Sequence, residues 1–264
     1  MTDSFIVKLI LSFVAGSLWI TMGTVLAERF GTRAGGVVAG LPSTVLVSLF
    51  FIGWTQSASV AAEATTIIPA VHGINALFVF LYISLLRYGF WFALSLALAL
   101  WFALSLLLVA SGFDSFPLSL LLYVILVVST YLIVEKTMSV PSEEGRKIRY
   151  TLSLVLFRAC FSGAIILISV VLAKVGGPMV GGAFSVFPTM FIGLLMITYF
   201  SQGPSFSAAV MKSSIPGAMS VVVYAAAVRY TYEPVGLVGG TVLSIALSLC
   251  TSVFIHRFLS GKTS

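Results

Sequence analysis

Residues 35–44 read GGVVAGLPST, and residues 181–190 read GGAFSVFPTM. Both stretches begin with two glycines and carry a proline at the eighth position, inside an apolar run where a helix should be continuous. The only two glutamines of the chain, Gln56 and Gln202, lie at the same offset of 146 residues as the two stretches. A shared offset over several motifs predicts an internal duplication, and this duplication decides the expected fold.

Composition places the chain in a membrane. Hydrophobic residues make up 59% of the 264 residues and charged residues only 8%, whereas soluble domains carry about 25% charged residues. The formal net charge of +6 is therefore interpreted as a signal of membrane topology, and no nucleic-acid partner is expected. The two cysteines, Cys160 and Cys250, lie in separate apolar segments and predict neither a metal site nor a disulfide.

The apolar runs predict an all-α polytopic membrane protein with about nine transmembrane helices. The expected spans are 4–27, 34–54, 57–86, 89–111, 116–134, 150–173, 178–200, 204–230 and 234–256. The duplication divides them into a first four-helix repeat over 1–112, a linker helix and cytoplasmic loop over 113–149, and a second four-helix repeat over 150–264. Five spans separate equivalent helices, and because five is odd the repeats have inverted topology. Many secondary transporters are built this way, with the substrate site near the midplane.

The basic residues predict the orientation. With nine spans, three bases fall on one side of the membrane, Lys8, Lys174 and Arg229, and two fall inside spans. The other side holds Arg29, Arg33, Arg87, Lys136, Arg146, Lys147, Arg149, Arg257 and Lys262. Because the basic side is cytoplasmic, we expect a multi-pass protein of the cell (inner or plasma) membrane, with its N-terminus outside and its C-terminus in the cytoplasm.

The second copy continues over residues 181–216 as GGAFSVFPTMFIGLLMITYFSQGPSFSAAVMKSSIP. This segment resembles the GlpM-type small four-helix inner-membrane proteins of bacteria in its small-residue start, its Phe-Pro-Thr centre, its polar break and the Ser/Ala stretch that follows. The resemblance covers each half of the chain, better in the second, where the first half has Leu-Pro-Ser at its centre, and it leaves the fifth span unmatched. It implies a fused, inverted pair of such units, and it implies no substrate.

Four prolines inside the expected spans predict helix breaks: Pro42, Pro69, Pro188 and Pro216. A proline removes a backbone donor and clashes with the preceding turn of a helix. In lipid the freed carbonyl groups need another partner. The alternative to a site at these positions is a packing kink, because proline and glycine are common in membrane helices.

Five polar or charged side chains inside spans are candidates for a substrate or ion pathway: Glu63, His72, Asn75, Arg158 and Lys212. Charges within a membrane are costly and usually face an interior or a cavity. One interpretation is a pocket that holds an anionic or zwitterionic solute against the two bases, while Glu63 exchanges a proton and His72 relays it. The other is a structural ion pair of Glu63 with Arg158 or Lys212, with Asn75 in an interhelical hydrogen bond.

We therefore expect a secondary transporter, ion- or proton-coupled, that moves a small solute through a site at the repeat interface. The alternative is a non-transporting membrane helper or scaffold whose charges form structural ion pairs. The sequence contains no nucleotide-binding loop, no cluster of metal ligands and no nucleophile with a neighbouring base, so we expect no enzyme, no cofactor and no metal. The expected partners are the lipid bilayer and a small solute or ion, and the sequence is compatible with a homodimer.

Overall fold

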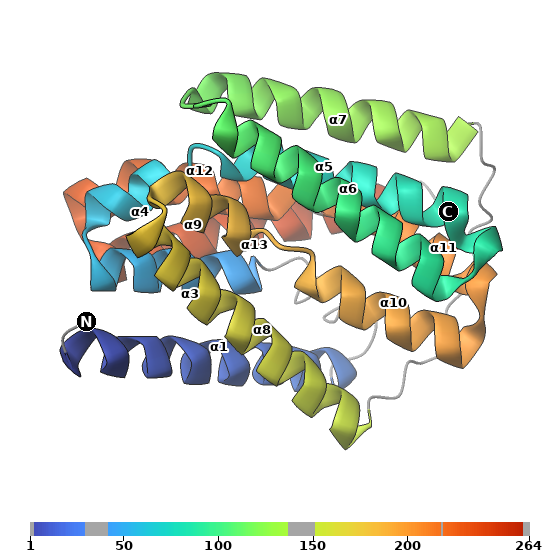
Figure 1. The fold of residues 1–264 in the computed structure, drawn as a ribbon, viewed down its shortest axis with the longest axis horizontal. Helices are drawn as coiled ribbons and strands as arrows, with labels where there is room; N and C mark the ends of the chain where they lie inside the picture. The colour runs from blue at the N-terminus through green and yellow to red at the C-terminus, as the bar shows by residue number, and fades with distance from the viewer. Residues whose placement is uncertain (1–2, 30–41, 137–150, 218, 261–264) are drawn as a thin grey trace.

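The computed structural model describes residues 3–29, 42–136, 151–217 and 219–260, and every regular element in these ranges is a helix (Figure 1). The first half contains α1 (Asp3–Arg29), α3 (Ser43–Thr55), α4 (Ala58–Ala64), α5 (Ile68–Leu85), the 3-10 turn η1 (Leu86–Tyr88) and α6 (Phe90–Ala110). The linker helix is α7 (Phe116–Lys136). The second half contains α8 (Leu152–Val175), α9 (Pro178–Ser185), α10 (Thr189–Gln202), α11 (Pro204–Gly217), α12 (Met219–Val235) and α13 (Leu237–Ser260).

Seven helical stretches are long and apolar enough to span a membrane, which confirms the expected polytopic all-α fold. A helix satisfies its own backbone hydrogen bonds, so apolar chain in lipid adopts this structure. Each of the nine expected ranges contains one helix or two consecutive helices. Three of these helices are short: α3 has 13 residues, α11 has 14 and α12 has 17.

The interrupted helices occupy the centre of the bundle. The α4–α5 stretch is 83% buried and the α9–α10 stretch is 67% buried, whereas the uninterrupted α6, α7 and α13 are 28%, 22% and 28% buried. An interruption leaves backbone groups without helical partners, and lipid cannot satisfy them. The interrupted helices are therefore enclosed, and the continuous helices face lipid.

All four prolines named above lie at or close to a helix end. α3 follows Pro42, whose backbone angles are φ −74° and ψ 53°, and α10 follows Pro188, with φ −73° and ψ 43°. Pro69 lies in the first turn of α5, just after the break that ends α4. Pro216 is the second-last residue of α11. A ring without an N–H is tolerated in a first turn and disrupts a helix interior.

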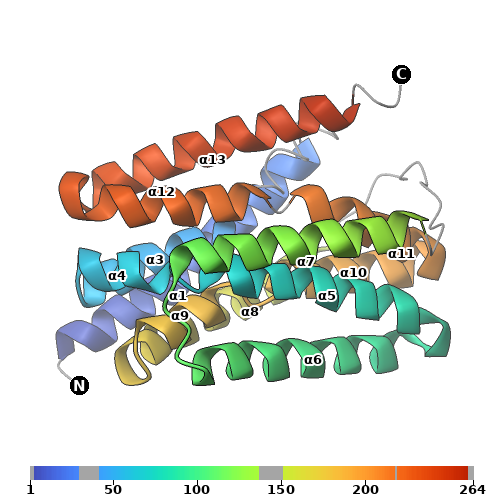
Figure 2. The same ribbon diagram turned by 90° about the horizontal axis from the view of Figure 1, so that it is seen from above.

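The helices recur in the same order in both halves. α10 starts 146 residues after α3, and α11 starts 146 residues after α4. Gly89 before α6 and Gly236 before α13 both have a positive φ, of 110° and 83°, which glycine adopts at no steric cost. The corresponding helices α4 and α11 lie at opposite ends of the bundle (Figure 1), and α6 and α13 form opposite flanks of it (Figure 2).

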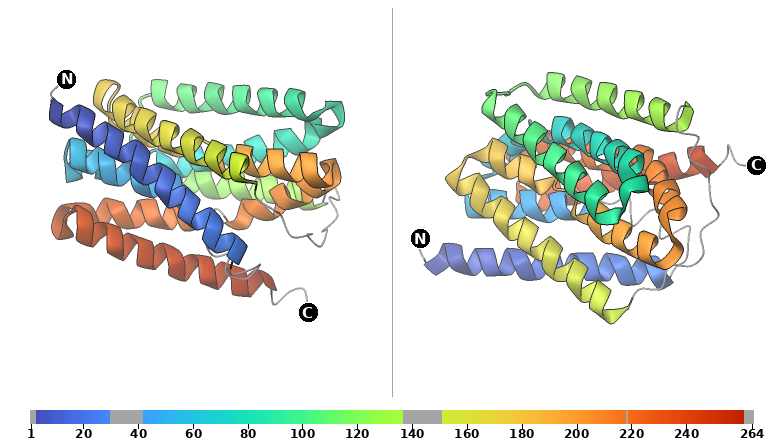
Figure 3. Two further views of the ribbon diagram at one scale, coloured as in Figure 1. Left: turned by 90° about the horizontal axis from the view of Figure 1, so that it is seen from below. Right: turned by 45° about the vertical axis from the view of Figure 1, so that its right-hand side comes forward.

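α1 and α8 cross at two glycines and run in opposite directions (Figure 1). A Cβ atom on Gly16 would lie 3.6 Å from the Cα of Gly163, and one on Gly163 would lie 2.8 Å from the carbonyl oxygen of Phe13. The Ser17 hydroxyl donates across the crossing to the Ala159 carbonyl at 3.0 Å. Small residues allow such close approach in lipid. The start of α1 and the end of α13 lie at opposite ends of the bundle (Figure 3).

One boundary differs from the expectation. The sequence predicts that the fifth span ends at residue 134, but α7 continues to Lys136, so Glu135 lies in its last turn. The continuation of the polar loop, 137–149, lies outside the described residues, and so does the first quoted stretch up to residue 41.

Candidate functional site

Asn75 joins the two halves of the chain. It lies on α5 with 4% of its surface exposed, and its Nδ2 donates to the carbonyl oxygen of Val186 at 3.1 Å. Val186 ends α9, two residues before Pro188. The break between α9 and α10 takes this carbonyl out of the regular helix pattern, and in a membrane a neighbouring side chain must then satisfy it. Asn75 makes the interhelical hydrogen bond that the sequence analysis gives as its alternative role.

His72 precedes Asn75 by one turn on the same face of α5. Its Nδ1 lies 3.3 Å from the Asn75 Nδ2. The Val186 carbonyl can only accept, so the nitrogen of the Asn75 amide must face it, and the same nitrogen donates to His72. The Nδ1 of His72 is therefore an acceptor, and the imidazole is neutral with its proton on Nε2. The side chain is 7% exposed, and its ring stacks on Tyr123 of α7 with the centroids 6.1 Å apart.

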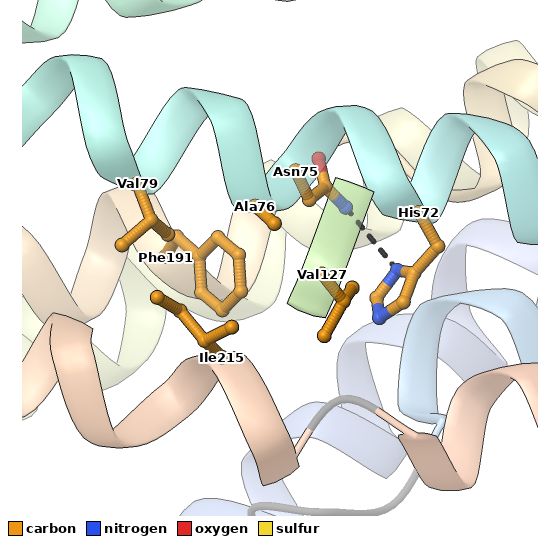
Figure 4. A pocket seen from close by; sticks show the side chains of 7 residues that line it. All are labelled: His72, Asn75, Ala76, Val79, Val127, Phe191 and Ile215. Atoms are coloured by element: carbon orange, nitrogen blue, oxygen red, sulfur yellow. Dashed lines mark hydrogen bonds between the residues drawn. The ribbon is translucent and has the colours of Figure 1, made fainter. Parts of the chain in front are cut away.

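A small pocket lies beside this pair, where α5, α7, α10 and α11 meet. Its lining residues are His72, Asn75, Ala76, Val79, Val127, Phe191 and Ile215. Figure 4 shows them around one space, with His72 and Phe191 on opposite sides of it. The empty volume is about 210 Å³, which is below the roughly 300–1,000 Å³ of pockets for drug-sized ligands. In this conformation the pocket suits water, an ion or a very small solute.

Lys212 pairs with a residue that the sequence analysis assigns to the loop. Its Nζ lies 2.7 Å from Oε2 of Glu135, so α11 is joined to the last turn of α7. The sequence analysis considers Glu63 as the partner of Lys212. In the described part of the chain the carboxylate that Lys212 contacts is that of Glu135.

Arg158 packs along α10. It is only 8% exposed, and a Cβ atom on Gly193 would lie 3.1 Å from its Cγ, so the missing side chain of Gly193 makes room for the arginine. Its Nη2 lies 3.5 Å from the sulfur of Met190. Both contacts are with α10, and Arg158 does not line the pocket described above.

Glu63 is exposed on the seven-residue helix α4. It lies in none of the contacts of Lys212 or Arg158 described above, and it does not line the pocket. The sequence analysis expects these three charged residues to share one pocket. The structure instead brings together His72 and Asn75, the two uncharged candidates, and places each charged candidate in separate surroundings.

Arg229 makes contacts that the sequence does not predict. It is half-buried on α12, and its Nη1 donates to the Thr66 hydroxyl at 2.8 Å and to the Ala62 carbonyl at 3.4 Å. Its guanidinium carbon lies 4.9 Å from the centre of the Phe116 ring. Arg229 therefore ties the second half to the break between α4 and α5. Its only signal in the sequence is a base close to a span end.

No metal site is formed in the described ranges, because no three His, Cys, Asp or Glu side chains there are grouped closely enough to hold an ion. Cys160 and Cys250 are free thiols.

Comparison with known proteins gives one match. Residues 9–112 match a family described as "Protein of unknown function (DUF3147)". The match covers less than half of the chain and ends at residue 112, where the first predicted repeat also ends. No curated protein and no solved structure matches the chain. The resemblance to the GlpM-type proteins and the tandem duplication stay predictions.

Proposed function

We propose that the chain is a secondary transporter, driven by protons or another ion, that moves a small solute between its two halves. The observation that carries the proposal is the pocket beside Asn75. There α5 of the first half meets α10 and α11 of the second, next to the break that ends α9. Inverted-repeat transporters hold their substrate at such a junction, where helices are interrupted near the midplane.

An inverted duplication is part of this proposal. It is supported by the similar backbone angles at Pro42 and Pro188, by the positive φ of both Gly89 and Gly236 and by the common order of the helices. The family match that ends at residue 112 agrees with a first unit of that length. Two inverted units can rock against each other, which would open the pocket to each side of the membrane in turn.

The pocket bears on the class of solute. Its lining consists of one imidazole, one amide and five apolar side chains, and Lys212 is engaged by Glu135 elsewhere. An anion buried without a compensating charge is strongly disfavoured. We therefore propose a small polar solute. The anionic or zwitterionic class that the sequence suggests would require Arg158 to turn from α10 towards the pocket.

The proposal includes a location and an orientation. The excess of Lys and Arg on one side of the expected spans favours a cytoplasmic C-terminus and an external N-terminus, in the inner or plasma membrane. We propose no catalytic role and no cofactor.

Uptake into proteoliposomes tests the proposal. Purified protein is reconstituted, and uptake of a panel of small labelled solutes is measured with an inward proton gradient, with an inward sodium gradient and with none. We expect one solute class to accumulate under one gradient. Asn75→Leu should reduce its uptake by about tenfold, the equivalent of about 1.4 kcal/mol, because leucine cannot donate to Val186.

Ser129→Ala is the matched control for this experiment. Ser129 is exposed on α7 and donates to carbonyl groups of its own helix, so its replacement should leave uptake unchanged. If folded, reconstituted protein takes up no solute of any class under any gradient, the transport proposal is contradicted.

A membrane helper or scaffold is the second candidate. It is favoured by the polar groups that are satisfied inside the chain, in the contacts between Lys212 and Glu135 and between Arg229 and Thr66. Thermal unfolding in detergent distinguishes the two functions. A transported solute at a hundred times its Kd stabilises the folded protein by about 2.7 kcal/mol, whereas a scaffold should show no shift with any solute in the panel.

A further inference from the structure

One atom of the Asn75 side chain has no role in the hydrogen bonds described so far. The Nδ2 donates to Val186 and to His72. The Oδ1 is buried and has no hydrogen-bond partner among the described residues. A buried acceptor without a donor costs about 1–3 kcal/mol. The group that could supply a donor is the imidazole that Asn75 already contacts.

A proton on His72 would change this pattern of donors and acceptors. A protonated imidazole donates from both of its nitrogens, so Nδ1 could no longer accept from the Asn75 Nδ2. Rotation of the amide by half a turn would bring Oδ1 to the new N–H and satisfy both groups. The same rotation would turn Nδ2 away from Val186, whose carbonyl would then lose this donor.

We infer that His72 and Asn75 form a proton-binding site that locks the break between α9 and α10 when His72 is neutral and releases it when His72 is protonated. The site takes up one proton from water onto the lone pair of Nδ1 and returns it to water, and no other bond is made or broken. As the coupling step of transport, this inference rests on the function proposed above. As a proton site, it stands on the hydrogen-bond geometry alone.

The groups on the elements packed against α5 are accounted for as follows. Tyr123 of α7 stacks on the His72 ring. Lys212 of α11 is paired with Glu135 of α7, and Arg229 of α12 donates to the α4–α5 break. α6 and α9 contain no ionisable side chain. The remaining titratable groups on these elements are Tyr224 and Tyr232, which share a hydrogen bond, and the half-buried or exposed Arg87, Tyr88, Tyr131, Lys136, Tyr230 and Glu233.

Trp101 is a native reporter of the break. It lies on α6 with 1% of its surface exposed, and its ring meets that of Phe187 edge-on with the centroids 5.1 Å apart. Phe187 lies in the break itself. The chain has four tryptophans, so replacing the other three with phenylalanine leaves Trp101 as the only fluorophore of its kind. Its emission is measured in detergent from about pH 8 to about pH 5, the range in which an imidazole changes charge.

We expect the Trp101 emission to move to longer wavelength as the pH falls, with the shape of a one-proton titration. His72→Gln should abolish this shift. Asn75→Leu should give the low-pH spectrum throughout, because the donor to Val186 is missing. His256→Gln removes the only other histidine and should leave the titration unchanged. A spectrum that does not respond to pH, or one that responds equally in His72→Gln, overturns the inference.

A second measurement leaves the site unaltered. In the His256→Gln protein, the nitrogen shifts of labelled histidine report on His72 alone. We expect the tautomer protonated on Nε2 at about pH 8 and the doubly protonated ring at about pH 5. A neutral ring protonated on Nδ1 at high pH, or no change in protonation over this range, overturns the inference even if the His72→Gln protein fails to fold.

These measurements need no solute, so the proton site and the transport function can fail separately. Titration of Trp101 without any solute flux contradicts transport and retains the proton site. Proton-driven flux that is unchanged in His72→Gln contradicts the proton site and retains transport.

Discussion

The ammonium nitrogen of Lys212 lies 2.7 Å from a carboxylate oxygen of Glu135. This contact joins α11 in the second half to the last turn of the linker helix α7. The two side chains are 14% and 45% exposed, so solvent screens their attraction, and an exposed pair contributes at most about 1 kcal/mol. The pair fixes the position of α7 more than it stabilises the fold.

A double-mutant cycle measures this pair. We expect a coupling free energy of about 0.5–1 kcal/mol between Glu135→Gln and Lys212→Met, from the unfolding of purified protein in detergent. The exchanged pair, Glu135→Lys with Lys212→Glu, should recover most of the lost stability, because the attraction is restored with reversed charges.

The matched control cycle pairs Lys212→Met with Glu63→Gln. Glu63 is exposed on α4, so its coupling to Lys212 should be zero within error. A coupling of Lys212 to Glu63 that exceeds its coupling to Glu135 would show that the pairing described here is incorrect.

The crossing of α1 and α8 should tolerate a methyl group on one glycine and not on the other. A Cβ atom on Gly163 would meet the Ser17 hydroxyl and lie 2.8 Å from the Phe13 carbonyl oxygen, which is backbone. A Cβ atom on Gly16 would meet the tip of the Ile166 side chain, which can rotate away. We expect Gly163→Ala to unfold at a free energy about 1–3 kcal/mol lower than Gly16→Ala. Equal stability of the two variants would contradict the crossing.

Arg229 should stabilise the break between α4 and α5 through Thr66. Thr66 is 2% exposed, and its hydroxyl accepts from the arginine at 2.8 Å. A hydrogen bond to a charged group is worth about 1.5–3 kcal/mol, so Arg229→Gln and Thr66→Val should show a coupling of that size in a double-mutant cycle. Arg87→Gln is the control, because Arg87 is exposed and its loss should change stability by no more than about 0.5 kcal/mol. Additive effects of Arg229→Gln and Thr66→Val would argue against the contact.

Gly182 should be the least replaceable glycine of the α9–α10 stretch. A Cβ atom there would overlap the Ala64 carbonyl oxygen and lie 2.9 Å from the carbonyl carbon, so α4 and α9 would have to separate. We expect Gly182→Ala to lower the free energy of unfolding by about 1–3 kcal/mol. Gly193→Ala is the control, since its Cβ atom would meet only the flexible Arg158 side chain, at 3.1 Å. The two variants are compared by thermal unfolding in detergent, and a Gly182→Ala protein as stable as Gly193→Ala would disprove the close contact.

Much of the fold could be predicted because lipid imposes a simple rule on apolar chain. A run such as 150–173 must form a helix to satisfy its backbone, and α8 occupies it. The prolines could likewise be assigned to helix breaks, because the missing N–H acts locally. The end of α7 was predicted two residues early, since hydropathy falls at Glu135 while the helical hydrogen bonds continue.

The candidate site could be predicted only in part. His72 and Asn75 are the rare polar residues of an apolar span, so the sequence identifies them. Their partner Val186 has an apolar side chain and takes part through its backbone carbonyl, which no residue type reveals. Glu135 was assigned to the loop, and Glu63 was considered as the carboxylate of the ion pair, because sequence gives the depth of a charge in the membrane and not the helix that it faces.

The sequence by itself determined that this is a polytopic helical membrane protein, where its helices lie along the chain and where prolines interrupt them, because these properties depend on hydropathy and on local backbone chemistry. Only the tertiary structure decided which helices are central and which polar groups meet. It enclosed the α4–α5 and α9–α10 stretches, and it joined Asn75 to Val186 across 111 positions. Those choices depend on packing between distant segments, since a broken helix in a membrane must find its missing hydrogen bonds on another helix.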